Sequence, residues 1–107
     1  MKKIMLVCAL GMSTSLMVSK MEKAAEEKGK EVEITAVPES EAYNLISQTD
    51  IVMLGPQVSY VFDNFKQQAE TFGVPVVLID ALDYGRMNGE KVLDDALAII
   101  ENRGTME

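Results

Sequence analysis

The chain contains no histidine, no tryptophan and a single cysteine, Cys8, among its 107 residues. Without histidine it cannot build a Ser-His-Asp or Cys-His catalytic site, and it cannot carry a phosphohistidine. A zinc finger needs several cysteine or histidine ligands and is excluded. One cysteine also excludes an internal disulfide, so nothing in the sequence points to an oxidising compartment.

Long apolar runs and basic clusters are missing too. No run of about 18 apolar residues is present, which excludes a membrane-spanning helix. The apolar residues 4–10 are followed by Gly11 and polar side chains, so we predict no signal peptide and a cytoplasmic protein. Residues 1–29 carry five lysines and three glutamates, whereas residues 30–107 carry five basic and fourteen acidic side chains. The resulting net charge of −7 disfavours nucleic-acid binding, which depends on neutralising phosphates.

Short apolar runs alternate with amphipathic stretches along the chain. The pattern predicts strands over residues 3–8, 31–37, 50–54 and 75–79, and helices over residues 13–28, 40–48, 59–72 and 89–103. Gly29 and Gly73 are expected to end the first and third helices in the left-handed conformation. The side chains predicted to face the core from the four helices are Leu16, Met17, Met21, Ala24, Ala25, Ala42, Leu45, Ile46, Val61, Phe62, Phe65, Ala69, Phe72, Val92, Leu93, Ala96, Leu97 and Ile100.

This βα alternation predicts one doubly wound α/β domain over residues 1–107, with a four-stranded parallel sheet covered by helices on both faces. The strand at 31–37 alternates polar and apolar residues, as an edge strand does, whereas the other three strands are expected to be buried. A strand order of 2-1-3-4 follows. Ligands of such folds bind beyond the carboxyl ends of the strands where the order reverses, which predicts a site formed by residues 8–15, 55–57 and 80–85.

The segment Cys-Ala-Leu-Gly-Met-Ser-Thr-Ser, which begins at Cys8, joins the first strand to the first helix. Cys8 could simply fill the strand end as a small apolar residue, and the hydroxyl residues could simply cap the helix. However, a helix N-terminus offers free N–H groups and a positive field, which bind anions and favour a thiolate. A nucleophile beside such a cradle predicts a phosphoryl-accepting site. The predicted phosphate-binding loop consists of Ala9, Leu10, Gly11, Met12, Ser13, Thr14 and Ser15.

Three stretches together resemble the enzyme IIB component of the lactose/cellobiose family of the phosphoenolpyruvate-dependent sugar phosphotransferase system (PTS). Residues 7–21, Val-Cys-Ala-Leu-Gly-Met-Ser-Thr-Ser-Leu-Met-Val-Ser-Lys-Met, resemble the opening of that family. Residues 50–60, Asp-Ile-Val-Met-Leu-Gly-Pro-Gln-Val-Ser-Tyr, are similar to its third strand and following loop. Residues 79–80, 84–85 and 88–89 resemble its fourth strand and the loop after it.

The resemblance implies a stand-alone IIB subunit whose family fold is also a four-stranded parallel sheet. Cys8 would accept a phosphoryl group from a phosphohistidine on the IIA subunit. It would pass that group to a β-disaccharide held by the membrane-embedded IIC subunit, with cellobiose-like and chitobiose-like sugars expected and lactose within the range. We further expect a monomer with no cofactor and no metal.

Residues beyond the other strand ends are expected to form a wall of this site. Gly55 and Pro56 would shape its mouth or would simply end a strand, and Gln57 would start a helix or line the wall. Tyr60 is expected to be half-buried packing rather than a ligand. Asp80 would sit in a turn or would orient a loop near Cys8.

Two other functions stay open. The loop resembles that of low-molecular-weight tyrosine phosphatases, whose Cys-x5-Arg motif clamps the phosphate; here Thr14 stands at the arginine position, which argues against a thiol phosphatase. A flavin- or nucleotide-binding module could use the loop as a cradle without chemistry. A third class, the response-regulator receiver, needs an acidic pair just after the first strand and an aspartate at the end of the third strand. Cys8 and Leu54 stand at these places instead, which argues against that class.

Overall fold

Four parallel strands form the centre of the molecule in a computed structural model that describes residues 1–9 and 11–105. They are β1 (Lys2–Cys8), β2 (Val32–Pro38), β3 (Ile51–Leu54) and β4 (Val76–Leu78). Their order is β2-β1-β3-β4, which confirms the predicted topology and places the alternating strand at an edge. The register aligns Val7 with Leu54 and Leu54 with Leu78, so the residues that follow these three strands emerge at one edge of the sheet.

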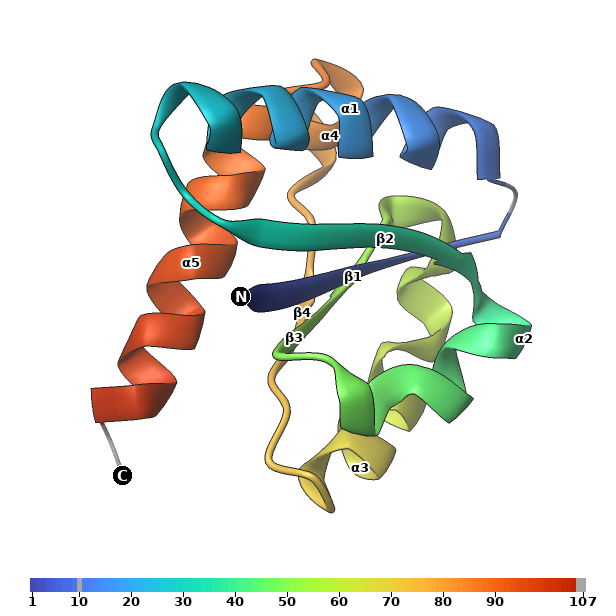
Figure 1. Cartoon of the computed structure of the whole chain (residues 1–107). Coiled ribbons are helices and arrows are strands. Elements are labelled where there is room, and N and C mark those ends of the chain that lie inside the picture. Colours follow the sequence, from blue (N-terminus) through green and yellow to red (C-terminus); the bar gives the residue numbers. More distant parts are fainter. Residues whose placement is uncertain (10, 106–107) are drawn as a thin grey trace.

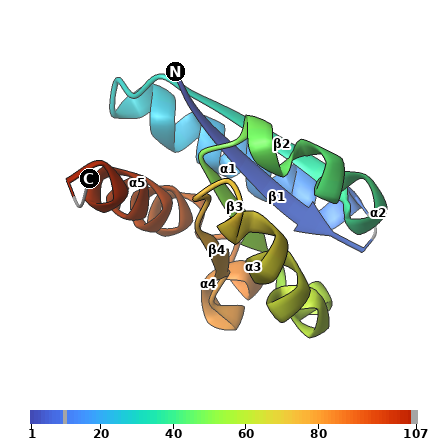
Figure 2. The same cartoon turned by 90° about the horizontal axis from the view of Figure 1, so that it is seen from below.

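Helices connect the strands and cover both faces of the sheet (Figure 1). In chain order they are α1 (Gly11–Glu27), α2 (Glu39–Ala42), the 3-10 turn η1 (Tyr43–Gln48), the 3-10 turn η2 (Pro56–Val61), α3 (Phe62–Glu70), α4 (Ala81–Gly85) and α5 (Gly89–Thr105). In Figure 2, β1 runs from the N-terminus toward the side of the molecule where α2 lies, away from the far end of α5.

Two separate cores hold these layers together. On one face, Met17 and Met21 of α1 pack with Leu93 of α5 against Leu6 and Met53 of the sheet. On the other face, Ile46, Val58 and Phe65 from η1, η2 and α3 pack against Val7 and Leu54. Because neighbouring residues of a strand point to opposite faces, the apolar run of β1 supplies both cores, which explains why it carries no polar residue between Ile4 and Cys8.

Glycines end α1 and α3 as the sequence predicts. Gly29 and Gly73 both adopt a φ of +66°, where a side chain would be strained. After each of them, an amide donates back over five residues, from Lys30 N to Ala25 O and from Val74 N to Ala69 O. This bonding pattern satisfies the last carbonyl groups of the helix and turns the chain toward the next strand.

Several side chains predicted to be buried are not. Leu16 and Phe72 are 49% and 50% exposed, because Leu16 lies beside the buried stripe of α1 and Phe72 follows the end of α3. Four further side chains, Leu45, Val61, Phe62 and Leu97, are half-buried. The prediction that the fourth strand is buried is also wrong. Leu78 of β4 is 47% exposed, because β4 is the second edge of the sheet.

Helix boundaries differ from the prediction near the strand ends. The helices expected over 40–48 and 59–72 each contain a 3-10 turn, η1 after α2 and η2 before α3. The helix α4 was not predicted, since five residues are too few to show a helical repeat. Of these elements, η2 and α4 directly follow β3 and β4 and so lie close to the edge of the sheet where the candidate site forms.

Candidate functional site

Cys8 is the last residue of β1 and pairs with Pro38 of β2. The residue is 3% exposed, and its thiol makes a weak hydrogen bond to the carbonyl oxygen of Val37 at 3.7 Å. The thiol is thus held between the two strands at the carboxyl edge of the sheet. A reaction partner must therefore reach the sulfur from the side of the loop that follows.

The helix α1 begins three residues after Cys8, at Gly11. The first amide groups of a helix have no acceptor within it and carry the positive end of its dipole. Leu10 lies outside the described residues, and only the backbone is described for Gly11, Met12 and Ser13. The structure thus confirms that β1 ends at Cys8 and that α1 begins three residues later along the chain.

Thr14 and Ser15 differ in their surroundings. Thr14 is 2% exposed, and its hydroxyl lies 3.1 Å from the hydroxyl of Tyr84, which is also buried. Ser15 is exposed on the surface of α1. Of the two hydroxyl groups, that of Thr14 is therefore the one built into the interior at the start of the helix.

Gly55 joins the end of β3 to the end of β1. Its amide donates to the carbonyl oxygen of Val7 at 3.2 Å, directly before Cys8. A Cβ atom at this position would lie 2.8 Å from Oε1 of Gln57 and 3.5 Å from the ring of Tyr84. Pro56 then starts η2, in which a fixed φ suits the first position. Gly55 thus allows the loop to lie close to the β1 end, and the exposed Gln57 folds back over it.

The sequence left the role of Asp80 open and misjudged the exposure of Tyr60. The carboxylate of Asp80 accepts hydrogen bonds from the amides of Leu82 and Asp83, so it caps the N-terminus of α4. The expectation that Tyr60 is half-buried is wrong, because it is 76% exposed on η2, where the chain runs along the surface. Leu82 on α4 is exposed as well, at 59%.

Tyr84 lies within the segment 80–85 that the topology places at the site, but the sequence gives it no role of its own. The structure places its ring against Gly55 and its hydroxyl on Thr14. An aspartate followed by Ala-Leu-Asp-Tyr could have signalled a capped helix that carries this tyrosine. No sequence signal could have paired it with Thr14, which lies 70 residues earlier.

A network of charges ties α4 to α5 behind this region. The ammonium group of Lys91 lies 2.9 Å from Asp83 and 3.1 Å from Asp95. The hydrogen bonds that Lys91 donates to Asp83 and, with a smaller effect, to Asp95 raise the pKa of Lys91 above its ordinary value. Lys28 at the end of α1 bonds in the same way to Asp94, which raises the pKa of Lys28. These contacts fix α4 and α1 relative to α5.

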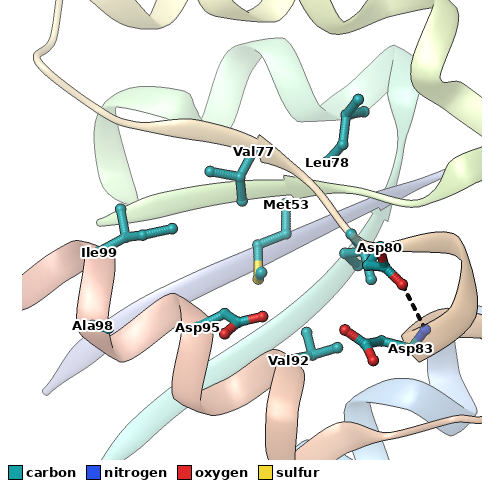
Figure 3. Close-up of a pocket in the computed structure, with 10 residues that line it drawn as sticks. Met53, Val77, Leu78, Asp80, Asp83, Val92, Asp95, Ala98 and Ile99 are labelled. Atoms are coloured by element: carbon teal, nitrogen blue, oxygen red, sulfur yellow. Dashed lines mark hydrogen bonds between the residues drawn. The ribbon is translucent and has the colours of Figure 1, made fainter.

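A pocket of about 280 Å³ lies between β4, α4 and α5 (Figure 3). In Figure 3 the side chain of Met53 points into it, and the carboxylates of Asp83 and Asp95 lie at its rim. Cys8 does not line this pocket, and Lys91 engages both rim carboxylates. Within the described part of the chain, no group of three or more acidic or cysteine side chains has the arrangement of a metal site.

The fold and the site define a doubly wound α/β protein with a cysteine at the carboxyl edge of its sheet, directly before a helix N-terminus. Residues 3–95 match the family model "PTS system, Lactose/Cellobiose specific IIB subunit", so the chain belongs to this family. The resemblance seen in the sequence is thereby confirmed.

Individual relatives agree with this assignment. The chain is 47% identical over 97 residues to the galactose-specific EIIB component of Lactococcus lactis, covering 86% of this chain and 90% of the relative. It is 39% identical over 103 residues to the oligo-beta-mannoside-specific EIIB component of Bacillus subtilis, covering 96% and 100%. The solution structure of a cellobiose-specific IIB component from Borrelia burgdorferi superimposes with a TM-score of 0.81 at 36% identity, covering 95% and 94%.

Proteins of this family are components of a sugar-uptake system that consists of several subunits. IIB proteins are phosphotransferase components that work with IIA and IIC subunits in sugar uptake. In the described part of this chain, no helix is both long and apolar enough to cross a bilayer.

Proposed function

We propose that this chain is a phosphoryl carrier whose Cys8 accepts a phosphoryl group from the phosphohistidine of a IIA subunit. Cys8 then passes the group to a sugar bound by the membrane-embedded IIC subunit. The observation that carries this proposal is the position of the thiol at the end of β1, beside the start of α1. The chain would act as a single IIB domain over residues 1–107, as a monomer, at the cytoplasmic side of the membrane.

Acceptance of the phosphoryl group requires a thiolate and a set of donors. The carbonyl of Val37 can accept a hydrogen bond from the thiol but cannot remove its proton, so the proton passes to solvent before attack. The sulfur then attacks phosphorus, an S–P bond forms and the N–P bond breaks, and the leaving imidazole takes up a proton. The amides of residues 9–15, with the hydroxyls of Ser13 and Ser15, would bind the three phosphoryl oxygens, while the hydroxyl of Thr14 stays paired with that of Tyr84.

The second transfer reverses the role of the sulfur. The oxygen of a sugar hydroxyl attacks phosphorus, an O–P bond forms and the S–P bond breaks. The hydroxyl proton is released to solvent, and the leaving thiolate takes up a proton from solvent, which regenerates the thiol. The carrier must protect its phosphoryl group from water between the two steps. The buried position of Cys8 at a strand end supports this requirement.

Transfer rather than hydrolysis fits the residue at position 14. An arginine there would stabilise the charge on a phosphoryl group in transfer to water, whereas Thr14 is neutral and its hydroxyl is paired with that of Tyr84. We therefore favour the carrier over a thiol phosphatase. The sugar is proposed to be a β-disaccharide of the cellobiose or chitobiose type, in keeping with the oligo-beta-mannoside and cellobiose names among the relatives.

The test is the intact mass of the protein after incubation with phosphoenolpyruvate, the general phosphotransferase proteins and a cognate IIA. We expect wild type and the control Ser19→Ala, a change at an exposed residue of α1 outside the loop, to gain one phosphoryl group, and Cys8→Ser to gain none or to form a dead-end ester. Circular dichroism checks that all three proteins are folded. A label on Ser13, Thr14 or Ser15 of wild type would contradict the proposal, and steady release of phosphate from an aryl phosphate would favour a phosphatase.

A further inference from the structure

We propose that Tyr84 is a positioning residue for this phosphoryl transfer, acting through its hydroxyl contact with Thr14 to hold the first turn of α1 in place beside Cys8. This inference rests on the proposed function, because it concerns how fast Cys8 accepts a phosphoryl group. In this proposal Tyr84 touches neither the thiol nor the phosphoryl group. It acts indirectly, by holding the start of α1 through Thr14.

The contact itself lies in the interior. Thr14 is the fourth residue of α1, and Tyr84 comes from α4; they are 2% and 6% exposed, with their hydroxyl oxygens 3.1 Å apart. A hydrogen bond between two buried hydroxyl groups is a directional link between elements, unlike the apolar contacts around it. The link reaches α1 one turn after its start, where the helix is least constrained by its own hydrogen bonds.

Tyr84 is well placed to transmit rigidity because its own position is fixed from two sides. Its amide donates to the carbonyl of Asp80 at 2.9 Å, within a helix that the Asp80 carboxylate caps. Its ring packs 3.5 Å from where a Cβ of Gly55 would be, and the Gly55 amide is bonded to Val7, next to Cys8. The first turn of α1, the residue that follows β3 and the helix that follows β4 therefore meet at Tyr84.

Such a link matters for transfer more than for folding. The amides at the start of α1 must lie within hydrogen-bond distance of the phosphoryl oxygens while the sulfur attacks in line, and displacements of about 1 Å reduce rates strongly. Without the Tyr84 hydroxyl, the first turn can shift while the rest of α1 stays packed against α5 through Met17 and Met21.

The matched pair of variants is Tyr84→Phe and Tyr43→Phe. Tyr43 also uses its hydroxyl in hydrogen bonds, with Asn64 at 2.9 Å and Glu39 at 3.4 Å, and its ring stacks on Phe65. It packs against the core on the opposite face of the sheet, so its variant removes a hydrogen-bonded tyrosine hydroxyl from a half-buried position without touching the loop. Comparison of the two separates positioning from a general loss of stability.

The kinetic readout is the single-turnover rate of Cys8 phosphorylation at increasing concentrations of phosphorylated IIA. We expect Tyr84→Phe to lower the maximal rate about tenfold and to leave the half-saturating IIA concentration unchanged, because Tyr84 is buried and so lies away from the surface that IIA can bind. Tyr43→Phe should stay within about twofold of wild type in both quantities. The proposal would be overturned if both variants lowered the maximal rate equally. It would also be overturned if Tyr84→Phe changed only the half-saturating IIA concentration.

Variants of Thr14 test whether the effect runs through this residue. Thr14→Val should slow transfer, and the double variant Thr14→Val/Tyr84→Phe should be no slower than the slower single variant. Thr14→Ser keeps the hydroxyl and should retain most of the wild-type rate. Additive losses in the double variant would show that Tyr84 does not act through Thr14.

Amide hydrogen exchange provides a readout that needs no phosphoryl donor. The amides of Ser15 and Leu16 have their helical acceptors in the first turn of α1, and in Tyr84→Phe they should exchange at least about threefold faster, with the end of the helix unchanged. Unchanged exchange would overturn the positioning proposal whatever the kinetics. Faster exchange in a protein whose wild type accepts no phosphoryl group would instead overturn the proposed function.

Discussion

Gly89, the first residue of α5, lies so close to Lys20 of α1 that a Cβ atom at position 89 would come within 2.6 Å of the Lys20 carbonyl carbon and Cβ. It would also lie 2.7 Å from the Met21 amide nitrogen. The two helices that cover one face of the sheet cross at this point. The close approach lets the buried side chains Met21 and Leu93 pack into the same core.

Gly89→Ala should therefore destabilise the protein. The added methyl group meets backbone atoms, which cannot move aside as a flexible side chain can, so the helices must separate. Overpacking of this kind costs about 1–3 kcal/mol in the free energy of unfolding. Urea denaturation measures the change.

The control for this prediction is Gly85→Ala in α4. A Cβ at Gly85 meets nothing within 4 Å, and its φ is not in the left-handed region. The substitution should raise the free energy of unfolding by up to about 0.5–1 kcal/mol, because alanine restricts the unfolded chain. Equal effects at positions 85 and 89 would contradict the steric explanation.

Asp80 provides a second prediction, which separates capping from a direct role in the site. Asp80→Ala removes the acceptor for the amides of Leu82 and Asp83 and should cost about 1 kcal/mol. Because α4 carries Tyr84, the same variant should also slow phosphorylation of Cys8. Asp80→Asn retains a capping oxygen and should keep both stability and rate.

Thermal unfolding and single-turnover phosphorylation measure these two properties. If Asp80→Asn transfers as slowly as Asp80→Ala, the charge of Asp80 matters at the site. The capping explanation would then be insufficient.

The ion pairs of Lys91 predict a dependence of stability on alkaline pH. Its bonds to Asp83 and Asp95 raise the pKa of Lys91 in the folded state, so folding favours the protonated form. The stabilisation is complete below the ordinary lysine pKa and is lost as pH rises through the raised value. Because Lys91 is half exposed, the effect is modest and should weaken with salt.

The measurement is the midpoint of thermal unfolding between about pH 9 and pH 12. It should fall less steeply with pH in Lys91→Met than in wild type. Lys66 is exposed and makes no ion pair with the described residues, so Lys66→Met should keep the wild-type slope. Identical slopes in all three proteins would show that the Lys91 contacts are too well hydrated to matter.

Periodicity predicted the architecture well because long elements repeat their pattern several times. The alternation over 31–37 identified an edge strand, and the confirmed order β2-β1-β3-β4 follows from it. Periodicity failed where an element is short, and where a residue lies at the margin of the apolar face of a helix. The five residues of α4 show no repeat, and Leu16 is displaced from Met17 by about 100° around the helix, enough to leave the core.

The sequence by itself determined the fold class, the family and the nearness of Cys8 to a helix start, because each of these depends on residues that are neighbours along the chain. Only the tertiary structure decided that Thr14 bonds to Tyr84, that Gly55 lies against the Tyr84 ring and that Gly89 touches the backbone of α1. These contacts join residues that the chain separates by tens of positions. Their partners are chosen by how the helices pack on the sheet, and packing distances leave no trace in local sequence patterns.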